Sequence, residues 1–151
     1  MTRRLGWSDV AARLAAARSY WLHTTGPDGA PHAVPVWGAV LDDVLYLYSE
    51  RSTVKACNVA RDPRVVIHLP DPEDCLIVHG TLEDLGDPRE LPAVVAALDE
   101  AYPAADDRAY LPSADPSFDV IWALRPQRAR SWRLADWDDS QAVWRGADAP
   151  G

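Results

Sequence analysis

The segment YWLHTTGPDGAPHAVPVWGAV, residues 20–40, decides the fold class. Residues 20–25 are aromatic and β-branched, which favours a strand, and Pro27-Asp28-Gly29 supplies a turn because an Asp-Gly pair tolerates positive φ. Residues 32–40 then read as the returning strand of a hairpin, with successive side chains on opposite faces. Pro35 cannot donate a hydrogen bond to a ladder, so we expect an edge, a bulge or a site at that point.

Shorter patterns on either side of this hairpin extend the sheet. We expect further strands over residues 44–49, 64–69, 75–85, 118–124 and 129–134, the third of these with a bulge at Gly80. Helices are expected over 8–18, capped by Ser8, over 51–60, capped by Ser52 and ended by Asp62-Pro63, and over 87–102. Residues 103–116 read as loop, and residues 136–151 as a polar tail with two tryptophans.

The expected fold class is mainly β with peripheral helices. Five strands, a helix and two more strands with short connections are typical of an antiparallel barrel of six to seven strands whose ends are covered by helices. A doubly wound α/β fold is excluded because no GxGxxG occurs and the early turns are too short for parallel crossovers. At 151 residues the chain fits a single domain, with its core over 7–135.

The composition is that of a globular, acidic protein. There are 23 acidic and 15 basic side chains, and the net charge of −8 argues against a nucleic-acid or anionic-membrane partner. No apolar run approaches the ~18 residues of a membrane helix. The first residues also lack the apolar region of a secretory signal, so we expect a cytoplasmic protein. Cys57 and Cys75 form no CxxC pair, which argues against zinc or a redox dithiol and favours two reduced, buried thiols.

The charge is distributed unevenly along the chain. Residues 71–119 hold 13 acidic and 2 basic side chains, whereas residues 1–70 hold 8 basic and 6 acidic ones. The basic cluster in that first part consists of Arg51, Lys55, Arg61 and Arg64, and Lys55 is the only lysine in the chain. The cluster begins where a strand is expected to end and a helix to start. There, backbone N–H groups, the helix dipole and the hydroxyls of Ser49, Ser52 and Thr53 favour an anion.

Two interpretations of this cluster stay open. The pattern predicts a small phosphate site. The alternative is that the arginines are solvated surface charges and that Ser52 only caps the helix.

No catalytic constellation accompanies the predicted phosphate site. His23, His32, His68 and His79 fall on four separate expected strands, without the spacing of a metal site. No GxSxG motif is present, and the carboxylates of residues 71–119 lie mainly on expected loops and on the polar face of a helix. A chain with a phosphate site and many aromatic residues, but no evident acid, base or nucleophile, is suited to a cofactor that carries its own chemistry.

Several short pieces, taken in order, resemble the pyridoxamine 5′-phosphate oxidase-like split-barrel family. They are WLHTT (21–25), DGAPH (28–32), PVW (35–37), LYLYS (45–49), STVKACNV (52–59), DPRV (62–65) and VHG (78–80), within about residues 7–135. The chain is most similar to the flavin/deazaflavin oxidoreductase branch, which uses coenzyme F420. The resemblance implies a homodimer of split barrels with two cofactor sites at the subunit interface.

The resemblance also assigns residues that bind the cofactor, whereas it leaves the catalytic residues unknown. Ser49, Arg51, Ser52 and Lys55 would hold the cofactor phosphate, and the backbone of Pro35, Val36 and Trp37 would lie against the isoalloxazine-type ring. Leu76, Ile77 and Trp132 of the partner subunit would close the site. His79 stands where the family often has glutamate, and Trp137 and Trp144 would pack at the interface or form a substrate wall.

The function implied by the resemblance is that of an F420-dependent oxidoreductase. Such an enzyme passes a hydride from the reduced cofactor to a small, electron-poor organic substrate. Three alternatives stay open: an FMN-binding enzyme like the pyridoxamine 5′-phosphate oxidases, a carrier or sensor that binds the cofactor without turnover, and a barrel that has lost its cofactor.

Overall fold

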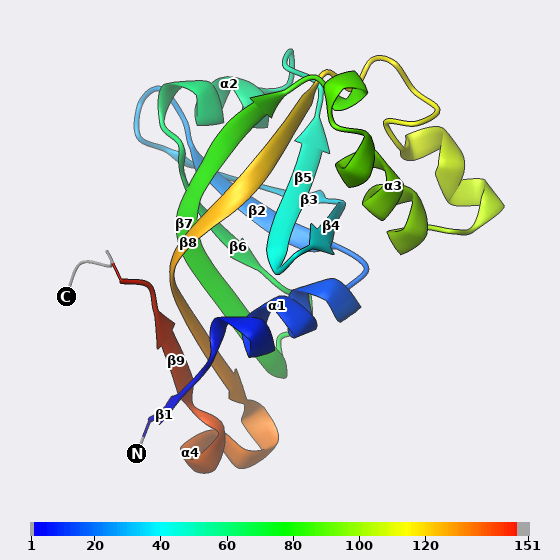
Figure 1. Ribbon diagram of the computed structural model, residues 1–151. Coiled ribbons are helices and arrows are strands. Elements are labelled where there is room, and N and C mark those ends of the chain that lie inside the picture. Colours follow the sequence, from blue (N-terminus) through cyan, green and yellow to red (C-terminus); the bar gives the residue numbers. More distant parts are fainter. Residues whose placement is uncertain (1, 148–151) are drawn as a thin grey trace.

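Nine strands and four α-helices make up the described part of the computed structural model, residues 2–147 (Figure 1). The strands are β1 (Arg3–Arg4), β2 (Tyr20–Thr25), β3 (Pro31–Val36), β4 (Gly38–Leu41), β5 (Val44–Ser49), β6 (Arg64–His68), β7 (Asp74–Gly86), β8 (Val120–Arg133) and β9 (Ala142–Arg145). The α-helices are α1 (Trp7–Ala16), α2 (Val54–Arg61), α3 (Pro92–Ala101) and α4 (Trp137–Ser140). The 3₁₀ helices are η1 (Pro88–Glu90), η2 (Ala105–Tyr110) and η3 (Leu134–Asp136).

The strands form one sheet that closes on itself. Its order is β1-β9-β8-β7-β6-β2-β3, and β5 pairs with both β4 and β8. Only Trp37 separates β3 from β4, so at this residue the chain passes from the β2 ladder to the β5 ladder and closes a ring of strands. The predicted barrel is confirmed, although the strands number nine rather than six or seven and the β1–β9 pair is parallel.

The long hairpin of β7 and β8 spans the whole barrel (Figure 1). The first part of β8 pairs with β5, and its last part pairs with β9. A register shift lies between His79 and Gly80, which confirms the predicted bulge. A Cβ atom at Gly80 would lie 2.4 Å from the carbonyl oxygen of Arg125, so no larger residue fits at this bulge without a backbone shift.

Two clusters of buried side chains stabilise this arrangement. The larger one fills the barrel, where alternate residues of each strand point inward, among them Leu22, Leu47, Ile67 and Val78. The smaller one lies between α3 and the sheet, around Leu98, Tyr102 and Ile121. The helices occupy different parts of the barrel: α2 lies at its upper end in Figure 1, whereas β1, β9 and α4 extend from the lower end.

Several predicted boundaries are wrong. The expected strand over 32–40 is interrupted at Trp37, and the expected strands over 118–124 and 129–134 are one strand, β8. Helix α1 is preceded by Gly6 as its N-cap rather than capped by Ser8. The segment 87–102 forms η1 followed by α3, and the expected loop 103–116 contains η2.

The described part of the expected polar tail, residues 136–147, is built into the fold. It forms α4 and β9, and β9 pairs with both β8 and β1 because the backbone groups at the edge of β8 need partners. Residues 148–151, the remainder of that expectation, lie outside the described residues.

The two cysteines are free, but neither is fully buried: Cys57 is exposed and Cys75 is half-buried. The expectation of buried thiols is therefore wrong, because Cys57 lies on the outer side of α2. Among the described helices, none is long and apolar enough to cross a membrane.

Candidate functional site

The turn that leads from β5 into α2 is held by hydroxyl groups. Thr53 is the N-cap of α2, where its Oγ1 accepts a hydrogen bond from the N–H of Ala56 at 3.4 Å and donates one to the carbonyl of Glu50 at 2.8 Å. The prediction that Ser52 caps the helix is wrong by one residue. Ser49 is buried, and its Oγ lies 3.1 Å from Thr53 Oγ1. The Ser49 hydroxyl therefore stabilises the turn from its buried side.

Lys55 lies in the first turn of α2 and is half-buried. Within the described part of the chain, its ammonium group forms neither a hydrogen bond nor an ion pair. Burial lowers the pKa of Lys55, because a charged group is disfavoured away from water, and the nearby carboxylate of Glu50 acts in the opposite direction. A half-buried cation without a fixed partner, beside the N-terminal N–H groups of a helix and the exposed Ser52, is suited to a small anion such as a phosphate.

Arg51 belongs to the same turn, but its guanidinium is already engaged. It donates two hydrogen bonds to the carboxylate of Asp84, at 2.6 and 3.0 Å, and its backbone N–H donates to Asp119 Oδ1 at 2.7 Å. The hydrogen bond to Asp84 raises the pKa of Arg51. A phosphate at this turn would therefore have to compete with Asp84 for the Arg51 guanidinium.

The predicted ring-binding segment lies where the sheet changes ladder. Pro35 is exposed on β3, which is the last strand in the order β1-β9-β8-β7-β6-β2-β3. The edge that we expected from the missing N–H of Pro35 is therefore confirmed. Val36 is buried in the barrel, and the Trp37 ring stacks on Tyr102 at 4.2 Å with Arg18 above it at 5.0 Å. Because the side chains of Val36 and Trp37 are already packed, only the backbone of this segment and the Pro35 ring can contact a ligand.

The residues expected from the partner subunit lie elsewhere on the sheet. Leu76 points into the barrel and is 1% exposed, so its side chain cannot reach a ligand outside. Ile77 and Trp132 are half-buried on the outer face, where the Trp132 ring meets the edge of Trp137 at 5.5 Å. Trp132 directly precedes Arg133, whose N–H donates to Ser140 of α4, at the end of the barrel opposite α2 (Figure 1). One subunit therefore brings Ser49, Arg51, Ser52 and Lys55 together, but not Trp132.

A family model described as pyridoxamine 5′-phosphate oxidase matches residues 8–133. The chain belongs to the pyridoxamine 5′-phosphate oxidase family. The predicted resemblance is confirmed, and the match covers the barrel, the turn before α2 and the β7–β8 hairpin. No curated protein matches the chain.

Solved structures support this membership of the pyridoxamine 5′-phosphate oxidase family. The conserved hypothetical protein Rv2991 from Mycobacterium tuberculosis is 26% identical with a TM-score of 0.72, over 88% of this chain and 90% of that one. An F420 reductase is 27% identical with a TM-score of 0.62, over 78% of this chain and 93% of that one. A heme binding protein from Mycobacterium smegmatis is 26% identical with a TM-score of 0.67, over 87% of this chain, which spans 55% of that protein's length.

Acidic residues around the turn were missed by the sequence interpretation. In this member of the pyridoxamine 5′-phosphate oxidase family, Glu50, Asp84 and Asp119 all contact or influence the predicted phosphate site. Asp84 comes from the end of β7 and Asp119 from the residue before β8, so only the sheet topology brings them to Arg51. Among the described residues, no group of three or more His, Cys, Asp or Glu is arranged to hold a metal ion.

Proposed function

We propose that the protein is an oxidoreductase that uses coenzyme F420. The observation that carries this proposal is Lys55, whose half-buried ammonium has no hydrogen-bonding or ion-pair partner in the described chain. A phosphate beside it would gain a charge-assisted hydrogen bond together with the N-terminal field of α2. Membership of the pyridoxamine 5′-phosphate oxidase family and the likeness to an F420 reductase support the choice of cofactor.

The chain would contribute binding and position rather than acid–base chemistry. Lys55 and Ser52 would hold the phosphate, while Ser49 and Thr53 keep the turn in shape. The backbone at Pro35 to Trp37 would lie against the ring of the cofactor, which supplies the hydride when it is reduced. The stack of Trp37 on Tyr102 fixes that backbone. FMN, which also carries a phosphate, is the alternative cofactor.

A homodimer would complete the site. Lys55 and Trp132 belong to opposite ends of one subunit, so both can border one cofactor only if a second copy supplies Trp132 (Figure 1). Ile77 and the neighbouring outer-face residues would then be covered by the partner. Sedimentation velocity measures the oligomeric state directly. A protein that stays monomeric at every concentration would contradict the shared site.

The phosphate assignment is tested by parallel titrations with F420 and FMN. Lys55→Ala should weaken the preferred cofactor by about 10- to 100-fold, which corresponds to a charge-assisted hydrogen bond of ~1.5–3 kcal/mol. Arg108→Ala, which removes an exposed positive charge from η2, is the matched control and should leave the affinity unchanged. Unchanged affinity in Lys55→Ala would contradict the assignment.

Turnover needs a separate experiment. Reduced F420 is mixed anaerobically with quinones, enones and nitroaromatic compounds in the presence of the protein. Oxidation faster than the protein-free rate supports the oxidoreductase, whereas tight binding without faster oxidation indicates a carrier.

A further inference from the structure

Three of the four histidines lie on one face of the sheet, on the outside of β2, β6 and β7. His23 lies opposite Val66, which in turn lies opposite His79, and His68 follows two residues after Val66 on β6. Because side chains alternate along a strand, all four residues point to the same side, away from the barrel interior that Ile67 fills. His23, Val66, His68 and His79 are called the histidine face below.

One ring nitrogen of the histidine face has no partner within a single subunit. His23 Nε2 is buried and forms no hydrogen bond in the described chain. A hollow of about 520 Å³ is lined by both His23 and His79, and none of its described lining residues is Asp or Glu. Arg64, which also lines it, is already paired with Asp62. A proton added to either histidine therefore gains no carboxylate in this hollow.

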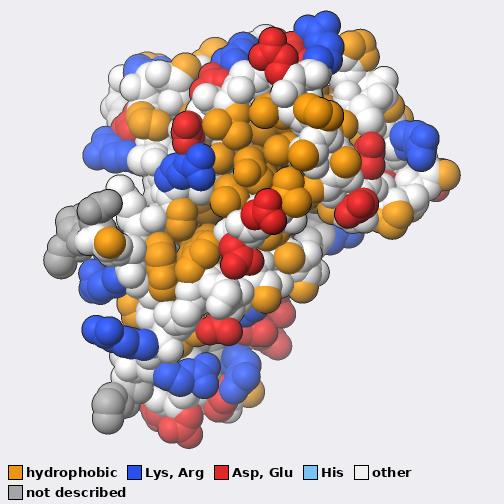
Figure 2. All heavy atoms as spheres, viewed as in Figure 1, with side chains coloured by type: hydrophobic (Ala, Val, Ile, Leu, Met, Phe, Trp, Pro, Cys, Tyr) orange, Lys and Arg blue, Asp and Glu red, His pale blue; other side chains and the backbone are white. Residues whose placement is uncertain are grey.

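Next to His79, the same face carries positive charge. Arg128 lies opposite His79 in the β7–β8 ladder, and Arg130 lies opposite Ile77. Neither arginine forms an ion pair within the described chain. Figure 2 shows Lys and Arg side chains gathered along the lower left side of the molecule, where β9 lies in Figure 1. Protonation of His79 would therefore add a charge beside charges of the same sign.

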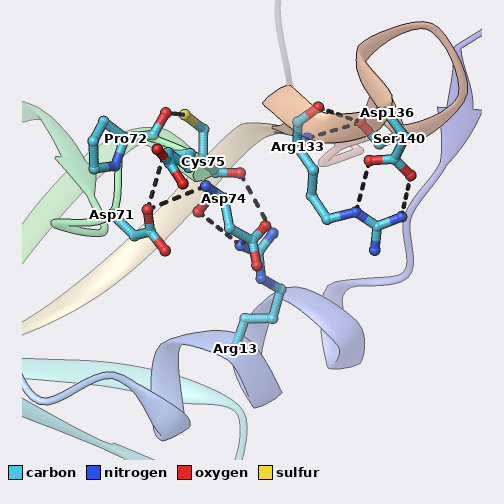
Figure 3. Close-up of polar contacts among 9 residues, drawn as sticks. Arg13, Asp71, Pro72, Asp74, Cys75, Arg133, Asp136 and Ser140 are labelled. Atoms are coloured by element: carbon cyan, nitrogen blue, oxygen red, sulfur yellow. Dashed lines mark hydrogen bonds and ion pairs between the residues drawn. The ribbon is translucent and has the colours of Figure 1, made fainter.

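The arginines at the lower end of this hairpin are neutralised. Arg13 of α1 is paired with Asp74 at the start of β7, and Arg133 at the end of β8 is paired with Asp136 (Figure 3). Carboxylates thus stand where these two arginines need them. The histidine face has no such carboxylate among the residues that lie opposite its histidines.

The surroundings of His23 and His79 disfavour their charged forms. The pKa of His23 is lowered first by burial and then by His68, whose ring centroid lies 4.8 Å away. From β3, Ala33 lies opposite His23 and carries no charge. The pKa of His79 is lowered first by burial and then by Arg128 and by the neighbouring arginine of β8. Both rings are therefore suited to the neutral form.

His68 completes the set without a charged neighbour across either ladder. Its Nδ1 lies 2.8 Å from the carbonyl oxygen of Leu69, which can only accept, so Nδ1 carries the hydrogen. Trp21 lies opposite His68 on β2, and Ile77 lies opposite it on β7. These uncharged side chains, with Trp21 36% exposed, give the histidine face an apolar surround.

The homodimer of the proposed function covers this face with a second copy. A cofactor bordered by both Lys55 and Trp132 needs a partner on the outer side of the β7–β8 hairpin, where Ile77 and His79 lie. In a two-fold dimer the same surface of both subunits forms the interface, so each histidine enters it twice. A neutral imidazole can be covered at small cost, whereas an imidazolium without a carboxylate cannot.

We propose that the homodimer is acid-sensitive, because protons taken up by His23 and His79 separate the two subunits and release the shared cofactor. The proposal rests on the homodimer of the proposed function, but not on the identity of the cofactor. The free subunit takes up protons more readily than the dimer, so acid favours the free subunit. The change lies below about pH 6.5, the ordinary histidine pKa, because both rings have a lowered pKa.

Sedimentation velocity of the cofactor-free protein tests the proposal. The dissociation constant of the dimer should rise about tenfold or more between pH 7.5 and pH 5.5, because two histidines in each subunit take up protons on separation. Circular dichroism at both pH values should show folded protein. The double variant H23Q/H79Q, neutral at every pH, should stay dimeric at pH 5.5.

His32→Gln is the matched control. His32 lies opposite the buried Thr24 on the other face of the sheet, so this variant should keep the pH dependence of the wild type. If circular dichroism shows that H23Q/H79Q is unfolded, the single variant His79→Gln, on the half-buried outer side of β7, should still reduce the pH dependence.

A second readout is cofactor binding at two protein concentrations. At pH 5.5 the affinity for F420 or FMN should be weaker than at pH 7.5, and a higher protein concentration should restore it because the dimer re-forms by mass action. A group that titrates inside the cofactor site would not respond to protein concentration.

Four results would overturn the proposal: a dissociation constant that does not change with pH, the same pH dependence in H23Q/H79Q, unfolding rather than separation at pH 5.5, or a monomer at every pH. Cofactor binding at pH 7.5 would leave the proposed function standing in the first three cases. A dimer that separates in acid but binds neither F420 nor FMN would support the acid-sensitive interface and contradict the proposed function.

Discussion

Lys55 carries a charge that its own surroundings disfavour. Burial lowers its pKa, and only Glu50 acts in the opposite direction. A lysine of this kind reduces the stability of the free protein, and a bound anion recovers that loss. The charge of the only lysine of the chain is thus one that the described fold does not pair, as the proposed phosphate site requires.

Lys55→Met separates these two roles. The variant should be more stable than the wild type at neutral pH, because the folded wild type must hold a charge that the unfolded chain holds more easily. The difference should disappear as the pH rises above the ordinary lysine pKa of about 10.4, where both states of the wild type are neutral. Urea denaturation at several pH values measures it, and cofactor binding should be weakened at every pH.

Asp84 limits the availability of Arg51. The two side chains are each about half exposed, so Asp84→Asn should cost only about 0.2–1 kcal/mol of folding stability. It should also release the Arg51 guanidinium and tighten cofactor binding several-fold. Glu83→Gln, which breaks the equally exposed pair with Arg125, is the control and should not change the affinity. Weaker binding in Asp84→Asn would show that Asp84 positions Arg51 rather than competes for it.

At the scale of elements, the hydroxyl of Tyr102, the residue that follows α3, adds polar contacts to the apolar packing of α3 on the sheet. Tyr102 Oη accepts a hydrogen bond from the N–H of Gly38 at 3.0 Å and donates to the carbonyl of Arg18 at 2.7 Å. Tyr102→Phe should destabilise the protein by about 1–3 kcal/mol, because a buried N–H loses its partner. Tyr110→Phe, at an exposed tyrosine of η2, should have little effect in the same denaturation experiment.

The elements also show what the sequence can and cannot predict. Asp62-Pro63 ends α2 as expected, but Ser52 and Thr53 are adjacent and both can cap a helix, so the cap could not be assigned. The expected strands over 118–124 and 129–134 left a gap at residues 125–128, and this gap contains Pro126. In the structure Pro126 lies at the register shift opposite Gly80, where the ladder is already interrupted, and β8 continues. The break at Trp37 arises from a change of pairing partner, which no local pattern records.

In the candidate site, too, local features could be predicted from the sequence, whereas contacts that depend on strand pairing could not. The β5–α2 turn and Lys55 are local features, so the residues in them could be identified from spacing. Asp84 and Asp119 reach Arg51 only through the pairing of β7, β8 and β5, and Leu76 was assigned to a site although alternation along β7 points it into the barrel. Long-range pairing is therefore what the sequence interpretation lacked.

For the molecule as a whole, histidines set a limit on stability in mild acid. His23 Nε2 is buried without a hydrogen-bond partner in the described chain, and its ring lies 4.8 Å from that of His68. The pKa of His23 is lowered by burial first and by His68 second, and Ala33 on the other neighbouring strand carries no charge. The neutral form is thus the one that suits the fold.

Stability should therefore decline as the pH falls below about 6.5, the ordinary histidine pKa, because the unfolded chain then takes up protons more readily than the folded one. The decline should end once the pH passes below the folded pKa values. Denaturation midpoints between pH 8 and pH 5 measure the effect, and His23→Gln should reduce it. A midpoint that stays constant or rises on acidification would contradict this account.

The pairing of β5 with β8 has a consequence for the nascent chain. Tyr48 pairs with Ile121, so one edge of β5 has no partner until β8 has been synthesised. Until then the emerging chain carries an open strand edge, rich in tyrosine and leucine, that other chains can pair with. Production of this protein should therefore depend on chaperones and on slow synthesis more than its modest size implies, because closure of the barrel is among the last steps of its folding.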